Sequence, residues 1–562
     1  MTSTIVIAHD KPITLDDVIA VACSGARVAL DQRTAALLDT RRAEVVAFIQ
    51  STGEQAYGFN RGFGHNVRLA VGPEGTEKLQ LNLIRSHACG IGPDTPEDVV
   101  RATMLLRAVS LARGYSGVRS ILVRTIVDCL NAGVTPVVPR LGSVSASGDL
   151  APLAHVALTL IGEGDVTGGT GKDKAAEALK RAGIAPLVLE MKEGLALTNG
   201  VQFSAAIAIL AAHRMRTLID STGIATALTT QVMLGADTPF RPDLHALRPH
   251  RGSERLAALI FALMRNSPLR EAHRSFDIDH EIQDPYNIRC AAQILGGADE
   301  LLVRAETTFT TEINSVTDNP IILPATKEAS WDAHFGGKFL GQHVDVVSGG
   351  HFHGMPVAID SYGLIQAAGI VASLINVRSA RYVDSARNRG LGSDLKWPGP
   401  SDDPSIQACH ALSSSMMMAE YASAGIANWI WGQAMPSHLF SLSTDAGQED
   451  HVSMASNVAW RAYDVMPRLA DSLAIEFAFA AQASAIRREA GVLPRREEAP
   501  LPLLPEGSRL SPPCEAVLAA IAPIFPPVTE DRPLAPELAE LATFIFNGGA
   551  VAAARQFISF SP

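Results

Sequence analysis

Long apolar segments without strand-like alternation dominate this 562-residue chain. Several exceed 25 residues and stay apolar around most of their circumference, as expected of helices buried in a bundle core or between subunits. The segments, rich in Ala, Leu, Ile and Met, are residues 33–50, 94–113, 116–131, 150–162, 174–183, 200–232, 253–265, 289–316, 340–379, 405–434 and 451–487. The pattern predicts a mainly α fold, a long-helix bundle that assembles as an oligomer.

Composition changes predict three consecutive parts. Residues 1–200 form a loop-rich N-terminal part, residues 201–490 a central long-helix bundle, and residues 491–562 a proline-rich C-terminal segment with a terminal helix near 536–546. The last part cannot be one continuous helix, because its stretch from 494 to 536 holds eleven prolines.

The N-terminal part opens with two local signals. Residues 4–8 predict a short strand, and Thr14 with Asp17 predicts a capping box that opens the first helix.

Charge and cysteine usage bound the class of protein. The chain carries 47 basic and 58 acidic residues, a net charge of -11 that argues against a nucleic-acid partner. Its six cysteines show no Cys-x-x-Cys spacing, which favours a reducing compartment over a disulfide framework or a zinc cluster. The N-terminus lacks a signal-peptide pattern, and polar residues interrupt the apolar segment 357–377. We therefore expect a cytoplasmic enzyme with no membrane span.

A Gly/Ser loop at residues 142–152 leads into an apolar helical pattern. Attack of the backbone nitrogen of Gly148 on the carbonyl carbon of Ala146 requires a tight turn, in which glycine is the least hindered residue. Loss of water from that ring and from Ser147 would leave a methylene conjugated to an imidazolone, a strong electrophile. The simpler alternative is that Asp149 or Ser147 caps a helix with Pro152 in its first turn.

Residues 142–155 resemble the signature of the aromatic amino acid ammonia-lyases and aminomutases. The resemblance implies that Ala146, Ser147 and Gly148 become 4-methylidene-imidazol-5-one, so that no external cofactor is needed. It also implies the long-helix bundle of the ammonia-lyase and fumarase-like type, and a homotetramer whose active sites draw on three subunits.

A second motif is the glycine-punctuated loop at residues 57–64. It resembles the family loop whose tyrosine is the catalytic base, and that tyrosine falls on Tyr57, whereas Arg61 replaces the usual threonine. An unperturbed tyrosine, with a pKa of about 10, is a poor base at neutral pH. Helix N-termini that converge on the site, as the family implies, would favour the phenolate.

Two motifs bear on the ring of the substrate. Ser86 and His87 resemble histidine ammonia-lyase, in which the corresponding histidine meets the substrate imidazole. Residues 447–454 resemble the same enzymes, with Gln448 and Glu449 in the substrate site and Gly447 in place of an asparagine. A carboxylate accepts the N–H of an imidazole, whereas beside a phenyl ring it would stay unpaired at a cost of about 1–3 kcal/mol.

Further matches concern the amine and the carboxylate of the substrate. Asn199, within residues 193–202, is placed by the resemblance to hydrogen-bond the cofactor ring or the substrate amine. A substrate α-carboxylate favours a planar bidentate donor, which Arg289 supplies. By resemblance Gln283 lies beside Arg289, and Tyr286 supports the cofactor and the elimination.

Two landmarks complete the pattern. Residues 318–321 match a family turn whose expected role is structural. In residues 348–354 Phe352, a substrate-site residue, and His353 match the family, but His351 stands where asparagine is usual. We expect no metal, because a His-x-His pair on a helix points to different faces and no third ligand follows.

The motifs together predict an ammonia-lyase acting on a small-molecule aromatic L-amino acid, with L-histidine and urocanate as the favoured substrate and product. The changes at Arg61, His351 and Gly447 leave two enzymatic alternatives open. One is a lyase for phenylalanine, tyrosine or a substituted phenylalanine, and the other is a 2,3-aminomutase. The alternative of a different class is a non-catalytic helical scaffold.

Overall fold

The computed structural model describes residues 4–53, 56–62, 68–168, 171–274, 283–324, 344–490 and 509–560. The chain divides into two compact units by its internal contacts. Unit 1 comprises Met1–Leu210, Ala305–Ser361 and Pro436–Trp460, and unit 2 comprises Ala211–Arg304, Tyr362–Met435 and Arg461–Pro562. These units interleave along the sequence, and the division into consecutive parts 1–200, 201–490 and 491–562 stays a prediction.

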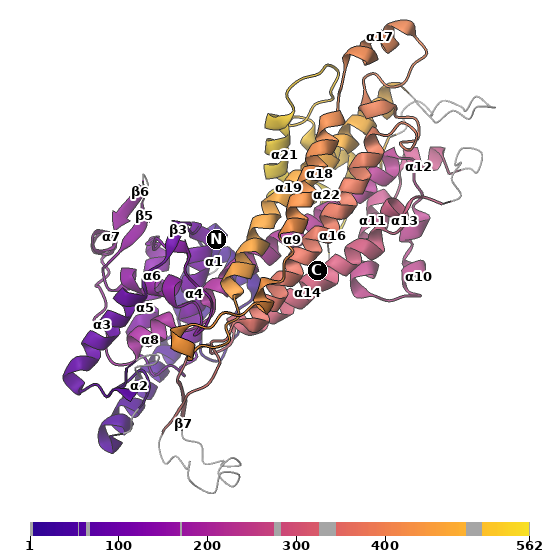
Figure 1. Cartoon of the computed structure of the whole chain (residues 1–562). Helices are drawn as coiled ribbons and strands as arrows, with labels where there is room; N and C mark the ends of the chain where they lie inside the picture. The colour runs from indigo at the N-terminus through magenta and orange to yellow at the C-terminus, as the bar shows by residue number, and fades with distance from the viewer. Residues whose placement is uncertain are drawn as a thin grey trace. The chain divides into compact units, whose positions relative to one another are not determined.

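The prediction of a mainly α fold is confirmed (Figure 1). Unit 1 holds α1 (Leu15–Ser24), α2 (Gln32–Thr52), α3 (Thr76–His87), α4 (Glu97–Ala112), α5 (Ser120–Ala132), α6 (Leu150–Leu160), α7 (Ala175–Ala182) and α8 (Glu193–Thr198). The longest helices have residues in both units and are α9 (Gln202–Val232), α14 (Ala291–Ile313), α16 (Met355–Val383) and α19 (Ala455–Ala490). Unit 2 adds α11 (Arg251–Met264), α13 (Tyr286–Arg289), α17 (Pro404–Leu412), α18 (Met417–Gly432), α20 (Pro512–Ile521), α21 (Ala535–Phe546) and α22 (Gly549–Ala554).

The strands of the described residues are short and pair two by two in unit 1. Strands β1 (Ile5–Ile7) and β2 (Val28–Leu30) are parallel, and Ile5 pairs with Val28. The antiparallel pairs are β3 (Ile91–Asp94) with β4 (Pro139–Leu141), β5 (Asp165–Gly168) with β6 (Gly171–Lys174), and β7 (Ile321–Pro324) with β8 (Val344–Val347). The strand predicted at residues 4–8 is confirmed.

The capping box predicted at the first helix is also confirmed. The backbone N–H of Asp17 donates to Oγ1 of Thr14 at 3.1 Å, and the backbone N–H of Thr14 donates to Oδ2 of Asp17 at 2.9 Å. Two free helical N–H groups are thereby satisfied, which fixes where α1 begins.

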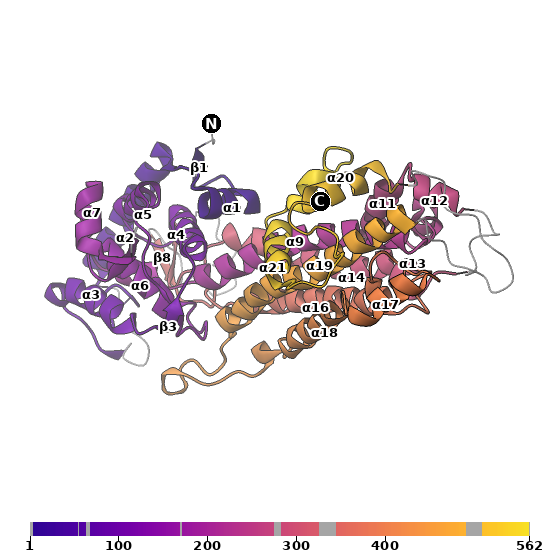
Figure 2. The same ribbon diagram turned by 90° about the horizontal axis from the view of Figure 1, so that it is seen from above.

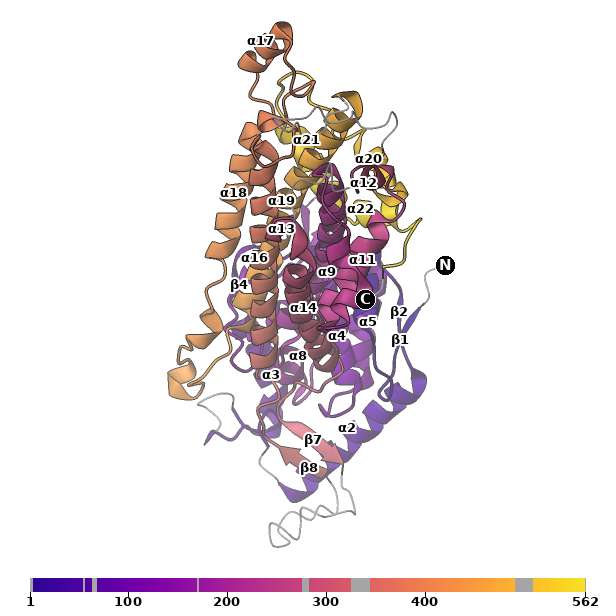
Figure 3. The ribbon, with the colours of Figure 1, turned by 90° about the vertical axis from the view of Figure 1, so that its right-hand side faces the viewer.

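Beside the candidate site, α2 packs on the β7–β8 pair (Figure 3). Val45 and Ile49 of α2 share a buried cluster with Phe59, Ile322 and Val344. This cluster anchors the loop that follows α2, where Tyr57 lies.

Two predicted helices were wrong in part. Residues 344–347 form β8, and α16 begins only at Met355, after a loop that contains the Gly349–Gly350 pair. Residues 340–343 lie outside the described part of the chain. Glycines disfavour the helix interior, whereas Pro356 is tolerated in a first turn.

The helix predicted over 405–434 is two helices, α17 and α18. The break falls on three serines, where Asp531 accepts hydrogen bonds from the hydroxyl of Ser413 at 2.6 Å and the backbone N–H of Ser414 at 2.8 Å. Serine side chains and a nearby carboxylate offer the backbone an alternative to helical hydrogen bonds. Two further helices were not predicted from the sequence. These are α3 and α20, the second of which lies within the proline-rich stretch.

Unit 2 is built around buried polar contacts between long helices. Arg378 of α16 and Glu476 of α19 form a fully buried ion pair, with Nε 2.7 Å from Oε1. Helix α20 packs against α22 and against α11, beside which it lies in Figure 2. Ser511, at the N-cap of α20, donates its backbone N–H to the side-chain oxygen of Gln231 in α9 at 2.8 Å. These contacts hold the C-terminal segment on the bundle.

Helices α16 and α19 are long and apolar enough to cross a membrane by length and composition alone. Their most apolar stretches have mean hydropathies of 1.5 and 1.3, but 67% and 83% of those stretches are buried inside the structure. Such burial is typical of core helices, and the polar residues that interrupt 357–377 point the same way.

Candidate active site

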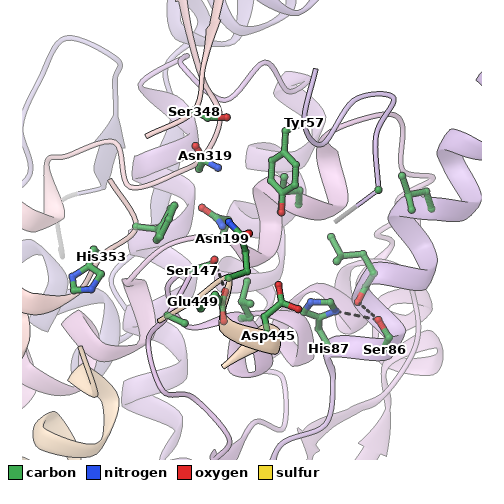
Figure 4. Close-up of a pocket in the computed structure, with 18 of the residues that line it drawn as sticks. Tyr57, Ser86, His87, Ser147, Asn199, Asn319, Ser348, His353, Asp445 and Glu449 are labelled. Atoms are coloured by element: carbon green, nitrogen blue, oxygen red, sulfur yellow. Dashed lines mark hydrogen bonds between the residues drawn. The ribbon is translucent and has the colours of Figure 1, made fainter. Parts of the chain in front are cut away.

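A cavity of about 1070 Å³ opens within unit 1 (Figure 4). Its size suits a small organic ligand. Its polar lining residues are Tyr57, Asn82, Ser86, His87, Ser147, Asn199, Asn319, Ser348, His353, Asp445, Gln448, Glu449, Asp450 and His451. The cavity thus collects most of the predicted site residues, Ala146 and Phe352 included, from six separate stretches of the chain.

The Ala146–Gly148 stretch forms a tight turn on the cavity wall. Gly148 has φ +80°, a conformation that glycine adopts at little cost. A Cβ at this position would lie 2.3 Å from the backbone oxygen of Gly200, closer than real atoms approach. The backbone N–H of Asp149 donates to that same oxygen at 2.7 Å. The sequence therefore needs glycine at position 148 because a second backbone segment presses against the turn.

Asp149 ties the turn to α9 and does not cap α6. It occupies the N-cap position of α6, but its side chain accepts no hydrogen bond from that helix. Its carboxylate accepts hydrogen bonds from the hydroxyls of Ser143 at 2.7 Å and Ser145 at 3.1 Å, and from both the hydroxyl and the N–H of Ser204 at 2.7 Å. Burial raises the pKa of Asp149, and these four hydrogen bonds oppose that rise.

Ser147 and Glu449 are in direct contact. The Ser147 hydroxyl donates to Oε1 of Glu449 at 2.7 Å. The other carboxylate oxygen, Oε2, accepts from the hydroxyl of Thr444 at 2.8 Å. Backbone hydrogen bonds in both directions, at 2.9 and 3.3 Å, pair Thr444 with Glu449. Thr444 thus fixes the carboxylate with one oxygen directed at Ser147.

His87 lies at the C-terminal end of α3. Its Nδ1 is 3.0 Å from the hydroxyl of Ser86, which itself donates to the carbonyl of Leu83 at 3.1 Å. Burial lowers the pKa of His87, and the negative charges of Glu449 and Asp445 oppose this shift. Figure 4 shows Asp445 beside His87. The resemblance singled out Ser86 together with His87, whereas Asp445 was not predicted to matter, because its place beside His87 does not follow from sequence spacing.

Tyr57 and Asn199 face the same part of the cavity. In Figure 4 the Tyr57 hydroxyl points toward the Asn199 side chain and the turn that carries Ser147. Asn199 is 2% exposed, and its side-chain oxygen has no hydrogen-bond partner among the described residues. A buried polar atom without a partner is costly, so this oxygen is suited to accept an N–H from a bound ligand.

Arg107 supports Asn199 from behind. This fully buried side chain on α4 donates to the backbone oxygen of Asn199 and, at 3.2 Å, to the side chain of Gln202. Burial lowers the pKa of Arg107 to about 10, and Asp318 opposes the shift. No sequence signal marked Arg107, since it lies inside an apolar helical segment.

Residues 318–321 do more than form a turn. Asn319 lines the cavity, and its side-chain oxygen accepts from the N–H of Gly349 at 2.8 Å. The preceding Asp318 forms an ion pair with Lys192 at 2.8 Å, and both side chains are fully buried. Burial holds the pKa of Lys192 below its ordinary value, and the charge of Asp318 partly opposes that shift. This pair joins the α8 segment to the wall of the cavity.

Gln283, Tyr286 and Arg289 are not among the residues that line the cavity, and all three belong to unit 2. Tyr286 is 68% exposed. The Arg289 guanidinium lies over the Tyr286 ring at 4.7 Å, and its Nε donates to the backbone oxygen of Asp284 at 3.1 Å.

The three departures from the family pattern also lie outside the cavity lining. Arg61 donates to the backbone oxygen of Arg68 at 2.6 Å, and His351 is exposed. Gly447 has φ +89° in the turn before Gln448. None of these residues contributes a side chain to the pocket wall, which weakens the argument that they redirect substrate choice.

Known proteins similar to the chain extend over nearly its whole length. A family model described as aromatic amino acid lyase matches residues 13–521. A histidine ammonia-lyase of Streptomyces coelicolor is 36% identical over 98% of both chains, and one of Gloeobacter violaceus is 39% identical over 84% of this chain and 86% of that protein. The crystal structure of a tyrosine aminomutase from Streptomyces globisporus superposes with a TM-score of 0.86 at 28% identity, covering 100% of both chains. The chain therefore belongs to the aromatic amino acid lyase family, and it is a carbon–nitrogen lyase.

Proposed function

We propose that this protein is a histidine ammonia-lyase that converts L-histidine to urocanate and ammonia. The observation that carries the substrate choice is the presence of His87 and Glu449 in one pocket wall. An imidazole N–H has an acceptor there, whereas a phenyl ring would offer neither group a hydrogen bond. Two relatives at 36% and 39% identity bear the name histidine ammonia-lyase, which supports the same choice.

We propose that Ala146, Ser147 and Gly148 form 4-methylidene-imidazol-5-one, the self-formed prosthetic group of this family. The residues present fit such a group. The turn at Gly148 leaves no room for a side chain, and the partnerless oxygen of Asn199 lies beside the triplet. When formed, the group would supply an electrophilic methylene for the substrate amine.

The side chains around this group have separate tasks in the proposal. Tyr57, whose hydroxyl faces the turn, removes the β-proton of the substrate. Asn199 accepts a hydrogen bond from the amine or the ring, and Arg107 holds the backbone of Asn199 in place. Phe352 and Gln448 line the substrate pocket with His87 and Glu449.

We propose a homotetramer in which Gln283, Tyr286 and Arg289 serve the site of another subunit. Arg289 would hold the substrate carboxylate as a bidentate donor, and Tyr286 would support the prosthetic group and the elimination. The exposure of Tyr286 supports this assignment. Exposed apolar side chains on α18, namely Met418, Tyr421, Trp429 and Trp431, offer a surface for subunit contact.

We propose a cytoplasmic location, since all six cysteines are free in the structure. Membership in a lyase family sets the non-catalytic scaffold aside. A second candidate activity is that of a 2,3-aminomutase, which the similarity to a tyrosine aminomutase structure favours. It would use the same residues and return the amine to the β-carbon.

One experiment separates these activities. Purified protein is incubated in parallel with histidine, phenylalanine, tyrosine and 3,4-substituted phenylalanines, and urocanate and cinnamate absorbance are followed. Rapid urocanate formation supports the proposal. Cinnamate without urocanate would replace histidine by a phenyl-type substrate, and a β-amino acid product would assign the mutase.

A further inference from the structure

The structure holds Ser147 with its hydroxyl intact and in contact with one carboxylate. Oε1 of Glu449 lies 2.7 Å from Oγ of Ser147, a short and strong hydrogen-bond distance. Formation of the prosthetic group must remove this hydroxyl as water. A carboxylate already bonded to the leaving oxygen is in position to take part in that step.

We propose that Glu449 is a catalytic residue in the formation of the prosthetic group, where it carries a proton from Cα of Ser147 to Oγ of Ser147. The inference rests on the proposed prosthetic group and adds a task to the substrate-binding role of Glu449. The two tasks fall at different times, because the group forms before any substrate is turned over.

The step balances within the residues named. The Cα proton of Ser147 passes to the Glu449 carboxylate, and the electron pair left behind becomes the Cα=Cβ π bond. The Cβ–Oγ bond breaks with its electron pair on the oxygen. That oxygen takes the proton from Glu449 and leaves as water, so Glu449 is regenerated and no co-reactant is required.

Other polar groups near the turn are less suited to this task. Both oxygens of Asp149 already accept hydrogen bonds from Ser143, Ser145 and Ser204. The amide oxygen of Asn199 cannot carry a proton at ordinary pH. Glu449 has one oxygen fixed by Thr444 and the other on Ser147, which is the arrangement that a proton carrier needs.

The same step prepares the substrate pocket. In the encoded chain Oε1 of Glu449 is occupied by the Ser147 hydroxyl. Loss of that hydroxyl removes the donor and leaves Oε1 open to the ring N–H of an imidazole substrate. Glu449 thus becomes available to the substrate only when the prosthetic group is complete.

The test is the intact mass of the purified full-length protein, followed over time after cell-free synthesis. Wild-type chain is expected to lose two waters from the encoded mass. Glu449→Gln keeps the side-chain size but cannot carry a proton, and it is expected to lose one water and keep the Ser147 hydroxyl in fragment spectra. Asp450→Asn is the matched control, since it removes the next carboxylate from the same wall, and it should lose two waters.

Thr444→Val provides a milder variant, because it removes only the hydrogen bond on Oε2. It should lose both waters more slowly than the wild-type chain does. Circular dichroism and thermal unfolding check that Glu449→Gln and Thr444→Val are folded. A two-water loss in Glu449→Gln at the wild-type rate overturns the proposal, as does a folded Glu449→Gln protein at the full encoded mass. Wild-type protein at the full encoded mass would instead refute the prosthetic group, and with it the proposed function.

Discussion

The Ser86 hydroxyl lies between the Leu83 carbonyl, at 3.1 Å, and Nδ1 of His87, at 3.0 Å. With the hydroxyl donating to Leu83, its oxygen is left to accept a hydrogen bond from the His87 ring. We therefore expect neutral His87 to carry its proton on Nδ1, which leaves Nε2 as an acceptor. With Glu449, this gives the pocket wall two acceptors, either of which can pair with the one N–H of a neutral imidazole ring.

The first prediction concerns substrate choice. We expect kcat/KM for histidine to exceed that for phenylalanine by roughly 10⁴-fold, because the phenyl ring leaves buried polar groups unpaired. Initial rates from urocanate and cinnamate absorbance measure the ratio. Comparable rates on both substrates would show that His87 and Glu449 do not contact the ring.

A second prediction concerns pH. Burial holds the pKa of His87 below its ordinary 6.5, so NMR titration should find the ring neutral at pH 6.5. Because the folded pKa is lower than the unfolded value, the stabilisation is present above about pH 6.5 and is lost as the pH falls toward the folded pKa. Protonation also removes the Nε2 acceptor, so KM for histidine should rise in acid.

The Ser86→Ala variant is the companion measurement for that titration. It removes the acceptor that holds Nδ1–H, so the ring should no longer show a single tautomer in ¹⁵N spectra. An unchanged tautomer ratio in this variant would contradict the role given to Ser86.

Ser147→Ala tests the proposed prosthetic group by activity. The variant should keep the fold, because Ser147 contributes one side-chain hydrogen bond at the cavity wall, and it should lose nearly all turnover. Ammonia release and thermal unfolding measure the two properties. Undiminished ammonia release would rule out the mechanism.

Tyr57→Phe and Arg289→Lys should fail differently. Loss of a general base is expected to lower kcat by roughly 10²–10⁴-fold with a smaller effect on KM. Arg289→Lys keeps the charge but loses the planar fork, so KM should rise by about 10–100-fold. Equal and small changes in both constants for both variants would show that the roles are misassigned.

Asp318→Asn should destabilise the fold. It leaves the fully buried Lys192 without its carboxylate partner, at an expected cost of about 3–5 kcal/mol in the free energy of unfolding. Urea denaturation measures this change. Glu163→Gln, in an exposed ion pair with Arg85, is the control and should leave the midpoint unchanged. Equal midpoints for both variants would contradict the assigned importance of the buried pair.

The sequence predicted most of the helices and much of the pocket. Apolar periodicity located α2, α9 and α19 to within a few residues, because apolar residues on their buried faces recur at helical spacing in the sequence. It failed at residues 344–354 and 413–415, where glycines and serines interrupt apolar segments. It also missed α3, which carries His87 and whose polar residues weaken the apolar pattern.

The contacts of the site were less predictable than its residues. Motif resemblance singled out Tyr57, Ser147, Asn199 and Glu449, all of which line one cavity. It could not single out Arg107, which has no motif and acts through the backbone of Asn199.

The sequence by itself determined the helical class, the family and the identity of the chemical groups. These follow from the periodicity of apolar residues and from motifs whose residues are adjacent in the sequence. Only the tertiary structure decided how those groups pair. The contact of Ser147 with Glu449 joins residues 302 positions apart, and the approach of Gly200 to Gly148 excludes any side chain there. Such pairings depend on how distant segments pack, and packing is a property of the folded chain that local sequence does not encode.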